Sequence, residues 1–321
     1  MSLIKRAASL AFGDEDFQAA KCIAGSVREE QFLQLFRSLM GILVAGLSDG
    51  ELLEVQELSF SGYVHGKTAI ESLDVFFQEA RLFLHCPQKL VWKYFGKFSS
   101  VPAGIGLLVS LVRMDLSANM LSDTLPPEFA RLENLVDLDL SENKFTSLPI
   151  HHLPRQIQTL ILVSNEIEQI PSEIREFGEL RLLDMSNNKI KRFPTEIGFL
   201  TKLTMLIAQH NSLSFLPEEI GDLENLVLLG LCHNELVTLP STVGRLVCLE
   251  SLDLETNQLT SLPRELTSLA NLTALDLRKN ERLAMPPFKE FPKLRRLWLD
   301  SGVCEDLDLP GVLISREGVG S

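Results

Sequence analysis

The sequence predicts an α/β solenoid. In this fold parallel strands line a concave face, short turns or 3-10 segments line the convex face, and an α-rich or mixed segment precedes the repeats. Two observations predict it. Asparagines recur every 22 to 24 residues between Asn119 and Asn280. Apolar residues also keep one spacing around each asparagine, as in Leu252, Leu254 and Leu259. A fixed period of this length is typical of stacked repeats.

The first half of each repeat predicts a strand. In Leu252-Asp253-Leu254 the two leucines point to one side and Asp253 to the other, because side chains alternate along a strand. A strand this short needs the next repeat's strand beside it. The asparagine that follows can donate to and accept from backbone groups that the turn leaves unpaired. We expect eight of these amides to form a buried ladder: Asn119, Asn143, Asn165, Asn188, Asn211, Asn234, Asn257 and Asn280.

The second half of each repeat reads Leu-Pro-x-Glu-Ile-Gly-x-Leu, as in residues 216–223. Proline fixes φ and removes a backbone donor. This half therefore favours extended or tight-turn structure over a long helix.

These motifs resemble the 23-residue intracellular class of leucine-rich repeats. They are similar to the repeats of Ras-associated scaffolds, of the scribble and erbin group, and of plant Ras-group-related proteins. The resemblance covers about residues 98–300. It implies a leucine-rich repeat solenoid and a non-catalytic scaffold or adaptor that binds a protein partner on its concave face. A small GTPase or another signalling protein is the partner class that the resemblance suggests, although such frames serve many partners.

The limits of the repeats divide the chain into three segments. Residues 1–97 form an N-terminal flank, residues 98–302 the repeats, and residues 303–321 a C-terminal tail. The last repeat has Gly302 in place of the asparagine, which indicates that the repeats end there.

The flank carries mixed signals. Residues 1–47 have helical spacing, and we expect them to cap the open end of the solenoid. Val55–Phe60 and Leu90–Phe95 read as strands, and Thr68–Leu84 reads as a helix.

One motif in the flank resembles a phosphate-binding loop. Residues 61–68 end in Gly66, Lys67 and Thr68, as such a loop does between a strand and a helix. However, Ser61 stands where the motif has glycine, and no later strand ends in a magnesium-binding aspartate. The alternatives are an ordinary glycine turn, or an ATP- or GTP-binding module that the repeats regulate or target.

Composition excludes several classes of function. The net charge of −13 disfavours nucleic acid and anionic membranes as partners. The longest apolar stretch, Phe32–Leu47, contains Gln34 and Arg37 and is short for a membrane span.

The five cysteines are scattered and form no clustered disulfide cap, so we expect a reducing, cytoplasmic location. No catalytic signature is present, and the sequence predicts neither an enzyme nor a cofactor.

The candidate partner site comes from the residues that face outward on each strand. Aspartate is common at the central outward position, but Ile161, Ile207 and Gly230 replace it in the middle repeats. An exposed apolar patch bordered by carboxylates is expected there, and such patches mark partner surfaces. The alternative is that the N-terminal flank or a second copy covers the patch. The predicted contact residues are Ile161, Val163, Leu182, Asp184, Met205, Ile207, Gln209, His210, Leu228, Cys232 and His233.

Two histidines occupy equivalent positions in adjacent repeats. His210 and His233 lie about 5 Å apart if their strands stack, beside Gln209 and Cys232. A metal site would need a further ligand. We therefore predict polar contacts with a partner at these positions, and no metal.

Overall fold

The computed structural model describes residues 57–61, 88–93, 99–284, 291–300, 309 and 311–317. The chain divides into two compact units, residues 1–144 with 151–154 and residues 145–150 with 155–321. The predicted helices in the N-terminal flank lie outside the described residues. No described helix has the length and hydropathy that crossing a bilayer requires.

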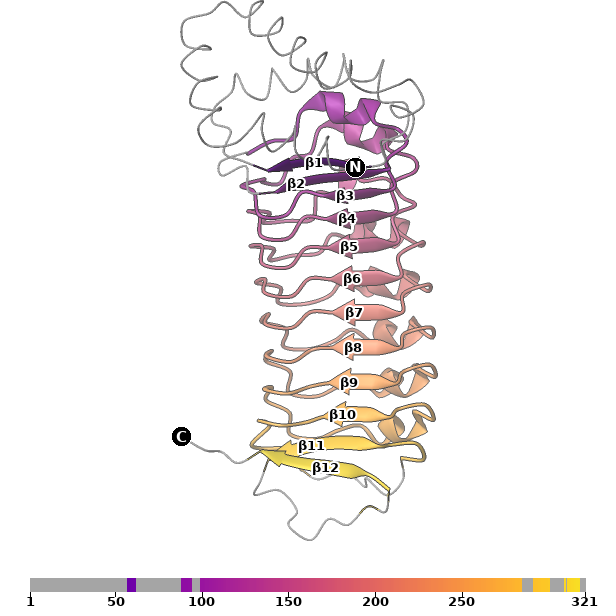
Figure 1. Ribbon diagram of the computed structural model, residues 1–321. Coiled ribbons are helices and arrows are strands. Elements are labelled where there is room, and N and C mark those ends of the chain that lie inside the picture. Colours follow the sequence, from indigo (N-terminus) through magenta and orange to yellow (C-terminus); the bar gives the residue numbers. More distant parts are fainter. Residues whose placement is uncertain are drawn as a thin grey trace, which may run out of the picture. The chain divides into compact units, whose positions relative to one another are not determined.

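Among its described residues, the first unit contains four parallel strands that pair in chain order (Figure 1): β1 Glu57–Ser61, β2 Lys89–Lys93, β3 Arg113–Asp115 and β4 Asp137–Asp139. The strands predicted near residues 55–60 and 90–95 are confirmed as β1 and β2. Leu90 pairs in register with Met114, and both side chains are buried. The strand ladder of the repeats therefore continues into the segment that the sequence assigns to the flank.

The second unit contains eight strands among its described residues, each parallel to the next. They are β5 Thr159–Ile161, β6 Leu182–Asp184, β7 Met205–Ile207, β8 Leu228–Gly230, β9 Ser251–Asp253, β10 Ala274–Asp276, β11 Arg296–Asp300 and β12 Leu313–Glu317. β12 comes from the predicted tail, so pairing continues past the last recognisable repeat.

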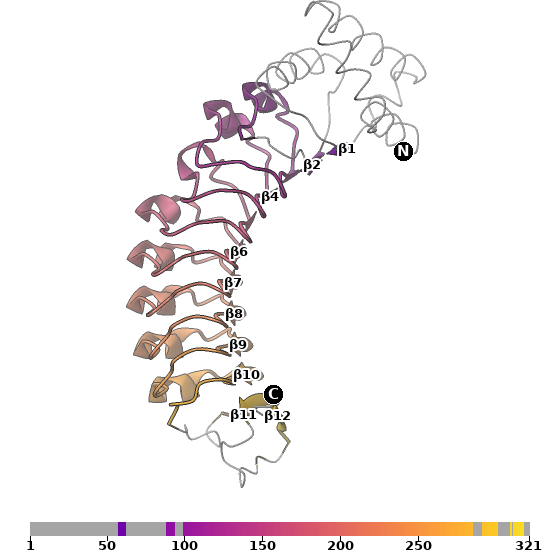
Figure 2. The ribbon, with the colours of Figure 1, turned by 90° about the vertical axis from the view of Figure 1, so that its left-hand side faces the viewer.

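Short 3-10 helices form the other side of each repeat. In the second unit they lie across the repeats from β6–β10 (Figure 2). Their bounds are η1 Ala103–Leu107, η2 Pro127–Arg131, η3 Ile150–His152, η4 Ser172–Glu176, η5 Thr195–Phe199, η6 Glu218–Asp222, η7 Ser241–Arg245 and η8 Arg264–Ser268.

The repeated proline explains why these segments are short helices. Pro217 precedes η6 with extended backbone, and its carbonyl accepts from the Ile220 N–H. The Leu223 N–H then donates to the Ile220 carbonyl and closes the helix after one turn. Ile220 and Leu223 are fully buried, so the turn packs its apolar side on the core.

Glycine in these helices permits close stacking of adjacent repeats. A Cβ on Gly221 would overlap the carbonyl oxygen of Thr242, and a Cβ on Gly244 would overlap that of Glu265. Any larger side chain would push the two repeats apart.

The asparagines join neighbouring turns by hydrogen bonds. In the second unit, Asn234 Nδ2 donates to the carbonyl of Leu231 in its own turn, at 3.0 Å, and to that of Ala208 in the preceding turn, at 2.9 Å. Its Oδ1 accepts from the Leu213 N–H at 3.0 Å. In the first unit, Asn143 makes the equivalent bonds to Leu116 and Leu121. Each of these amides satisfies backbone groups that would otherwise be buried without partners.

The residue before each ladder asparagine has left-handed backbone, with φ between 51° and 56°. This conformation turns the chain sharply from the strand into the ladder position. It is uncommon outside glycine, asparagine, aspartate and histidine. The residues concerned are Ala118, Glu142, Ser164, Asn187, His210, His233, Thr256 and Lys279.

Candidate partner-binding face

The side of the second unit's sheet that points away from the core is named here the strand face. In β5–β10 the middle residue of each strand is buried, and the first and third residues point the other way. The residue two positions further along continues the same face. In β5–β10 the face consists of Thr159, Ile161, Val163, Leu182, Asp184, Ser186, Met205, Ile207, Gln209, Leu228, Gly230, Cys232, Ser251, Asp253, Glu255, Ala274, Asp276 and Arg278.

The structure brings six predicted apolar residues together on β5–β8. We call them the apolar patch: Ile161, Val163, Leu182, Met205, Ile207 and Leu228. Leu182, Met205 and Leu228 lie in register on consecutive strands and form a continuous row. All six side chains are half-buried, whereas the sequence suggested an exposed patch. The reason is that strands about 4.8 Å apart bring large side chains into contact with one another.

Gly230 lets its neighbours lean over β8. A Cβ on Gly230 would lie 3.3 Å from Ile207 Cγ2 and 3.2 Å from Gln209 Nε2. These two side chains therefore occupy the space that a larger residue would fill. Because glycine replaces aspartate at this position, the Ile207 and Gln209 side chains form the border of the apolar patch at β8.

The aspartate that recurs on the strand face has a local structural role. Asp184 Oδ1 accepts from the Ser186 N–H at 3.0 Å and from the Ser186 hydroxyl at 2.7 Å. Asp253 accepts in the same way from the Glu255 N–H at 3.1 Å. The carboxylate thus caps the end of its own strand. The sequence showed only that aspartate is common at this position and did not predict its hydrogen bond to the N–H two residues later.

The two histidines lie side by side at the end of the strand face. The rings of His210 and His233 stack with centroids 4.1 Å apart and an angle of 14° between their planes. Partial burial, and then the neighbouring His210, lower the pKa of His233. A charge on His233 is therefore disfavoured in this position. His210 is exposed and His233 is half-buried.

Cys232 is buried and does not act as a reactive thiol. Burial, followed by the Asp253 carboxylate that accepts its hydrogen bond, raises the pKa of the Cys232 thiol to about 12. A thiol that stays protonated is a poor nucleophile and a poor metal ligand. Among the described residues, no three His, Cys, Asp or Glu side chains are grouped to hold a metal ion.

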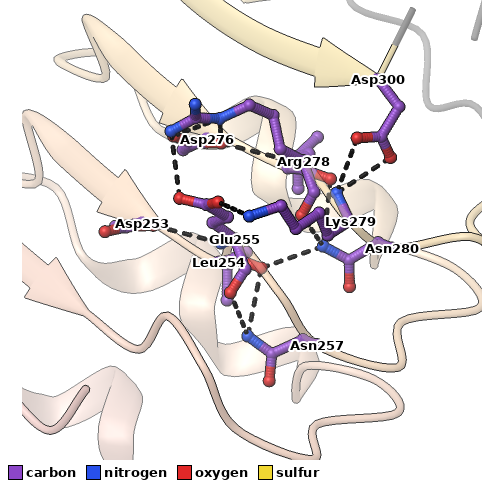
Figure 3. Close-up of polar contacts among 10 residues, drawn as sticks. Asp253, Leu254, Glu255, Asn257, Asp276, Arg278, Lys279, Asn280 and Asp300 are labelled. Atoms are coloured by element: carbon purple, nitrogen blue, oxygen red, sulfur yellow. Dashed lines mark hydrogen bonds and ion pairs between the residues drawn. The ribbon is translucent and has the colours of Figure 1, made fainter. Parts of the chain in front are cut away.

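Charged side chains gather on the strand face near the ends of β9 and β10 (Figure 3). Arg278 donates through Nε and Nη2 to the Asp276 carboxylate, with a shortest distance of 2.6 Å, and through Nη2 to Glu255 at 3.0 Å. Lys279 Nζ donates to the other oxygen of Glu255 at 2.8 Å. We call Glu255, Asp276, Arg278 and Lys279 the ion-pair cluster.

The two carboxylates at this end of the face differ in their surroundings. Partial burial alone would raise the pKa of Glu255, but the Lys279 hydrogen bond and the charges of Arg278 and Lys279 hold it below its usual value. Within the part of the chain that the structure describes, no lysine or arginine pairs with Asp253. Burial raises the pKa of Asp253, and the nearby Asp276 adds to the effect.

Sequence reasoning missed the ion-pair cluster, although a signal existed. Glu255 and Arg278 occupy the same position in adjacent repeats, where earlier repeats have Ser186, Gln209 and Cys232. Opposite charges at equivalent positions indicate an ion pair across two turns. Gly66, Lys67 and Thr68 of the phosphate-loop motif lie outside the described residues.

Comparison with known families identifies the repeats. A family model described as "Leucine rich repeat" matches residues 155–213 and 220–281, and a second model of the same description matches residues 110–132. The chain therefore carries leucine-rich repeats in both units.

Individual relatives resemble parts of the chain. A leucine-rich repeat protein of Leptospira interrogans has a TM-score of 0.58 at 29% identity over 83% of this chain and 69% of that chain. An internalin of Listeria monocytogenes has a TM-score of 0.60 at 21% identity over 79% and 76%. Toll-like receptor 10 of Bos taurus is 39% identical over 77 residues, which are 24% of this chain and only 10% of the receptor. The solved structures support the solenoid fold of parallel strands and 3-10 turns.

Proposed function

We propose that this leucine-rich repeat chain binds a protein partner through the strand face of β5–β9. Leucine-rich repeat proteins generally mediate protein–protein interactions, and their regular face of outward side chains suits that role. The observation that supports the site is the in-register row of Leu182, Met205 and Leu228. Apolar side chains at outward positions of a sheet add little to the core, and they gain free energy when a partner covers them.

The size of the apolar patch limits how much binding free energy it can contribute. Burying a large aliphatic side chain completely is worth about 1.5–3 kcal/mol. The six side chains of the patch are already half-buried, so a partner gains on the order of 1 kcal/mol from each. Association itself costs at least about 4 kcal/mol. The patch therefore supports modest affinity, and tight binding needs contacts beyond it.

We propose further that the protein works as a non-catalytic adaptor in the cytoplasm, in a signalling pathway. Cys232 and Cys248, the described cysteines, are both free thiols, which agrees with a reducing compartment. The resemblance to Ras-associated repeat proteins makes a small GTPase one candidate partner class.

The test is capture from a lysate of the source cells, followed by mass spectrometry. A variant with Ile161, Met205, Ile207 and Leu228 all replaced by Ser should lose the captured partner. The control replaces four exposed apolar residues away from the strand face by Ser, namely Phe199, Phe215, Val237 and Val247. This control should keep the partner.

Both variants must show unchanged circular dichroism for the comparison to hold. Loss of capture by the control variant alone would place the binding site on the other side of the repeats and refute the proposal.

A further inference from the structure

The strand face changes its chemistry between β8 and β9. On β6–β8 its first residues are Leu182, Met205 and Leu228, and on β9 the corresponding residue is Ser251. At the third position, Gly230 pairs in register with Asp253. An apolar surface therefore ends directly beside a carboxylate.

Two carboxylates adjoin the apolar patch. Asp184 lies between Ile161 and Ile207, and its Oδ1 already accepts from the Ser186 N–H and hydroxyl. Asp253 lies at the β9 border of the patch, and no cation of the described residues pairs with it. Glu255 and Asp276 are both engaged by Arg278, and Glu255 also by Lys279. Asp253 accepts instead from the Glu255 N–H and from the Cys232 thiol, which are both neutral donors.

The surroundings of Asp253 favour a cation from outside the chain. The side chain is half-buried, which makes its charged form costly. Its register neighbour on β8 is glycine, and the Ile207 and Gln209 side chains lie over that glycine, so an apolar side chain of the patch covers the strand next to Asp253. The whole chain carries a net charge of −13, which attracts basic segments over a longer range.

The spacing of the strands indicates what kind of segment fits. Neighbouring strands lie about 4.8 Å apart, so β6 and β9 are separated by roughly 14 Å. An extended chain that crosses the strands rises about 3.4 Å per residue, and every second side chain points to the same side. Residues i and i+2 then lie over β6–β8, and residue i+4 reaches β9 at Ser251 after about 14 Å. Asp253 lies two residues further along β9, roughly 7 Å away, which is within reach of a long lysine or arginine side chain.

We propose that the partner presents an extended segment with apolar side chains at positions i and i+2, over Leu182, Met205 and Leu228, and with lysine or arginine at position i+4, paired with Asp253. This inference rests on the proposed function and adds the chemistry of the partner. A second copy of the chain is a poor occupant because two chains of charge −13 repel each other.

The test uses a displayed library of random 12-residue peptides, selected on the full-length protein. Selected peptides should be enriched in two apolar residues followed by a basic one at this spacing. The tightest peptide is then synthesised with a fluorescent label, and its Kd is measured by anisotropy against three variants. They are Asp253→Asn, Leu228→Ser and, as the control, Asp222→Asn in η6.

Asp253→Asn keeps an oxygen for the Glu255 N–H, so the strand cap is preserved while the charge is lost. It should weaken the peptide about tenfold, the effect expected of a partly buried ion pair. Asp222→Asn changes the net charge equally, on an exposed side chain, and should leave Kd within about twofold. A second peptide with its basic residue replaced by norleucine should bind wild type and Asp253→Asn equally.

The outcomes separate the two proposals. Peptides that need Leu228 but show no basic preference, or bind Asp253→Asn as well as wild type, would overturn this inference and leave the proposed function standing. A selection in which no peptide is weakened by Leu228→Ser would overturn both.

Discussion

The interior and the strand face of the second unit follow different rules. In the interior each turn repeats the same contacts: a buried leucine in mid-strand, an asparagine bonded to two turns, and a proline before a 3-10 helix. On the strand face the residue changes from turn to turn: the first outward position is apolar on β6–β8, and the second and third outward positions are charged on β9 and β10. Repetition therefore specifies the fold, and departures from it carry the recognition chemistry.

The largest test of this contrast compares two adjacent leucines of β8. Leu229 is 1% exposed and Leu228 is half-buried on the strand face. Leu229→Ala should lower the free energy of unfolding by about 4 kcal/mol, because it leaves a cavity in the core. Leu228→Ala should lower it by only about 1 kcal/mol but weaken partner binding. Urea unfolding measures the first effect and capture of the partner the second.

Equal stability losses for Leu228→Ala and Leu229→Ala would contradict the division between core and strand face. An unchanged slope of free energy against urea concentration is needed to show that both variants unfold from the same compact state.

The second test breaks one step of the asparagine ladder. Asn234→Ala removes the acceptor for the Leu213 N–H and the donor to the carbonyls of Ala208 and Leu231. Leaving buried backbone groups unpaired should cost about 3 kcal/mol of unfolding free energy. The matched control is Asn225→Ala, because exposed Asn225 makes one bond to Thr201 and should cost less than about 1 kcal/mol.

Hydrogen exchange localises the ladder effect. The Leu213 amide should exchange faster in Asn234→Ala and unchanged in Asn225→Ala. Similar stability losses in both variants would mean that the ladder contributes no more than a surface amide does.

Much of the fold could be predicted from the repeated residues alone. The frame around Leu252, Leu254 and Asn257 predicts the strand, its buried residue and the turn, because each depends on contacts that recur in every repeat. The phase of the frame also predicts which residues face outward. The sequence did not predict that β1 and β12 pair with the strands of the repeats, because their segments lack the repeated asparagine.

The details of the strand face could not be read from the frame. The half-burial of Ile207, the space over Gly230 and the bonding of Arg278 all depend on side chains of neighbouring turns. A repeat pattern places these residues on one face. It does not give the rotamers that decide whether a side chain packs on its neighbour or pairs with a charge.

The smallest expected change in unfolding free energy concerns the left-handed residue before each ladder asparagine, because its residue type differs from turn to turn. Thr256 has φ of 53°, the side chain is β-branched, and its buried hydroxyl oxygen has no hydrogen-bond partner among the residues that the structure describes. The equivalent residue two turns earlier is His210, and one turn before that it is Asn187, whose residue type tolerates this conformation. Thr256→Asn should therefore raise the unfolding free energy by about 1 kcal/mol, and Asn187→Thr should lower it by about as much. Both shifts are measurable as urea midpoints. Because the two exchanges are reciprocal, shifts of the same sign would show that neighbouring side chains, and not backbone strain, decide which residue these positions accept.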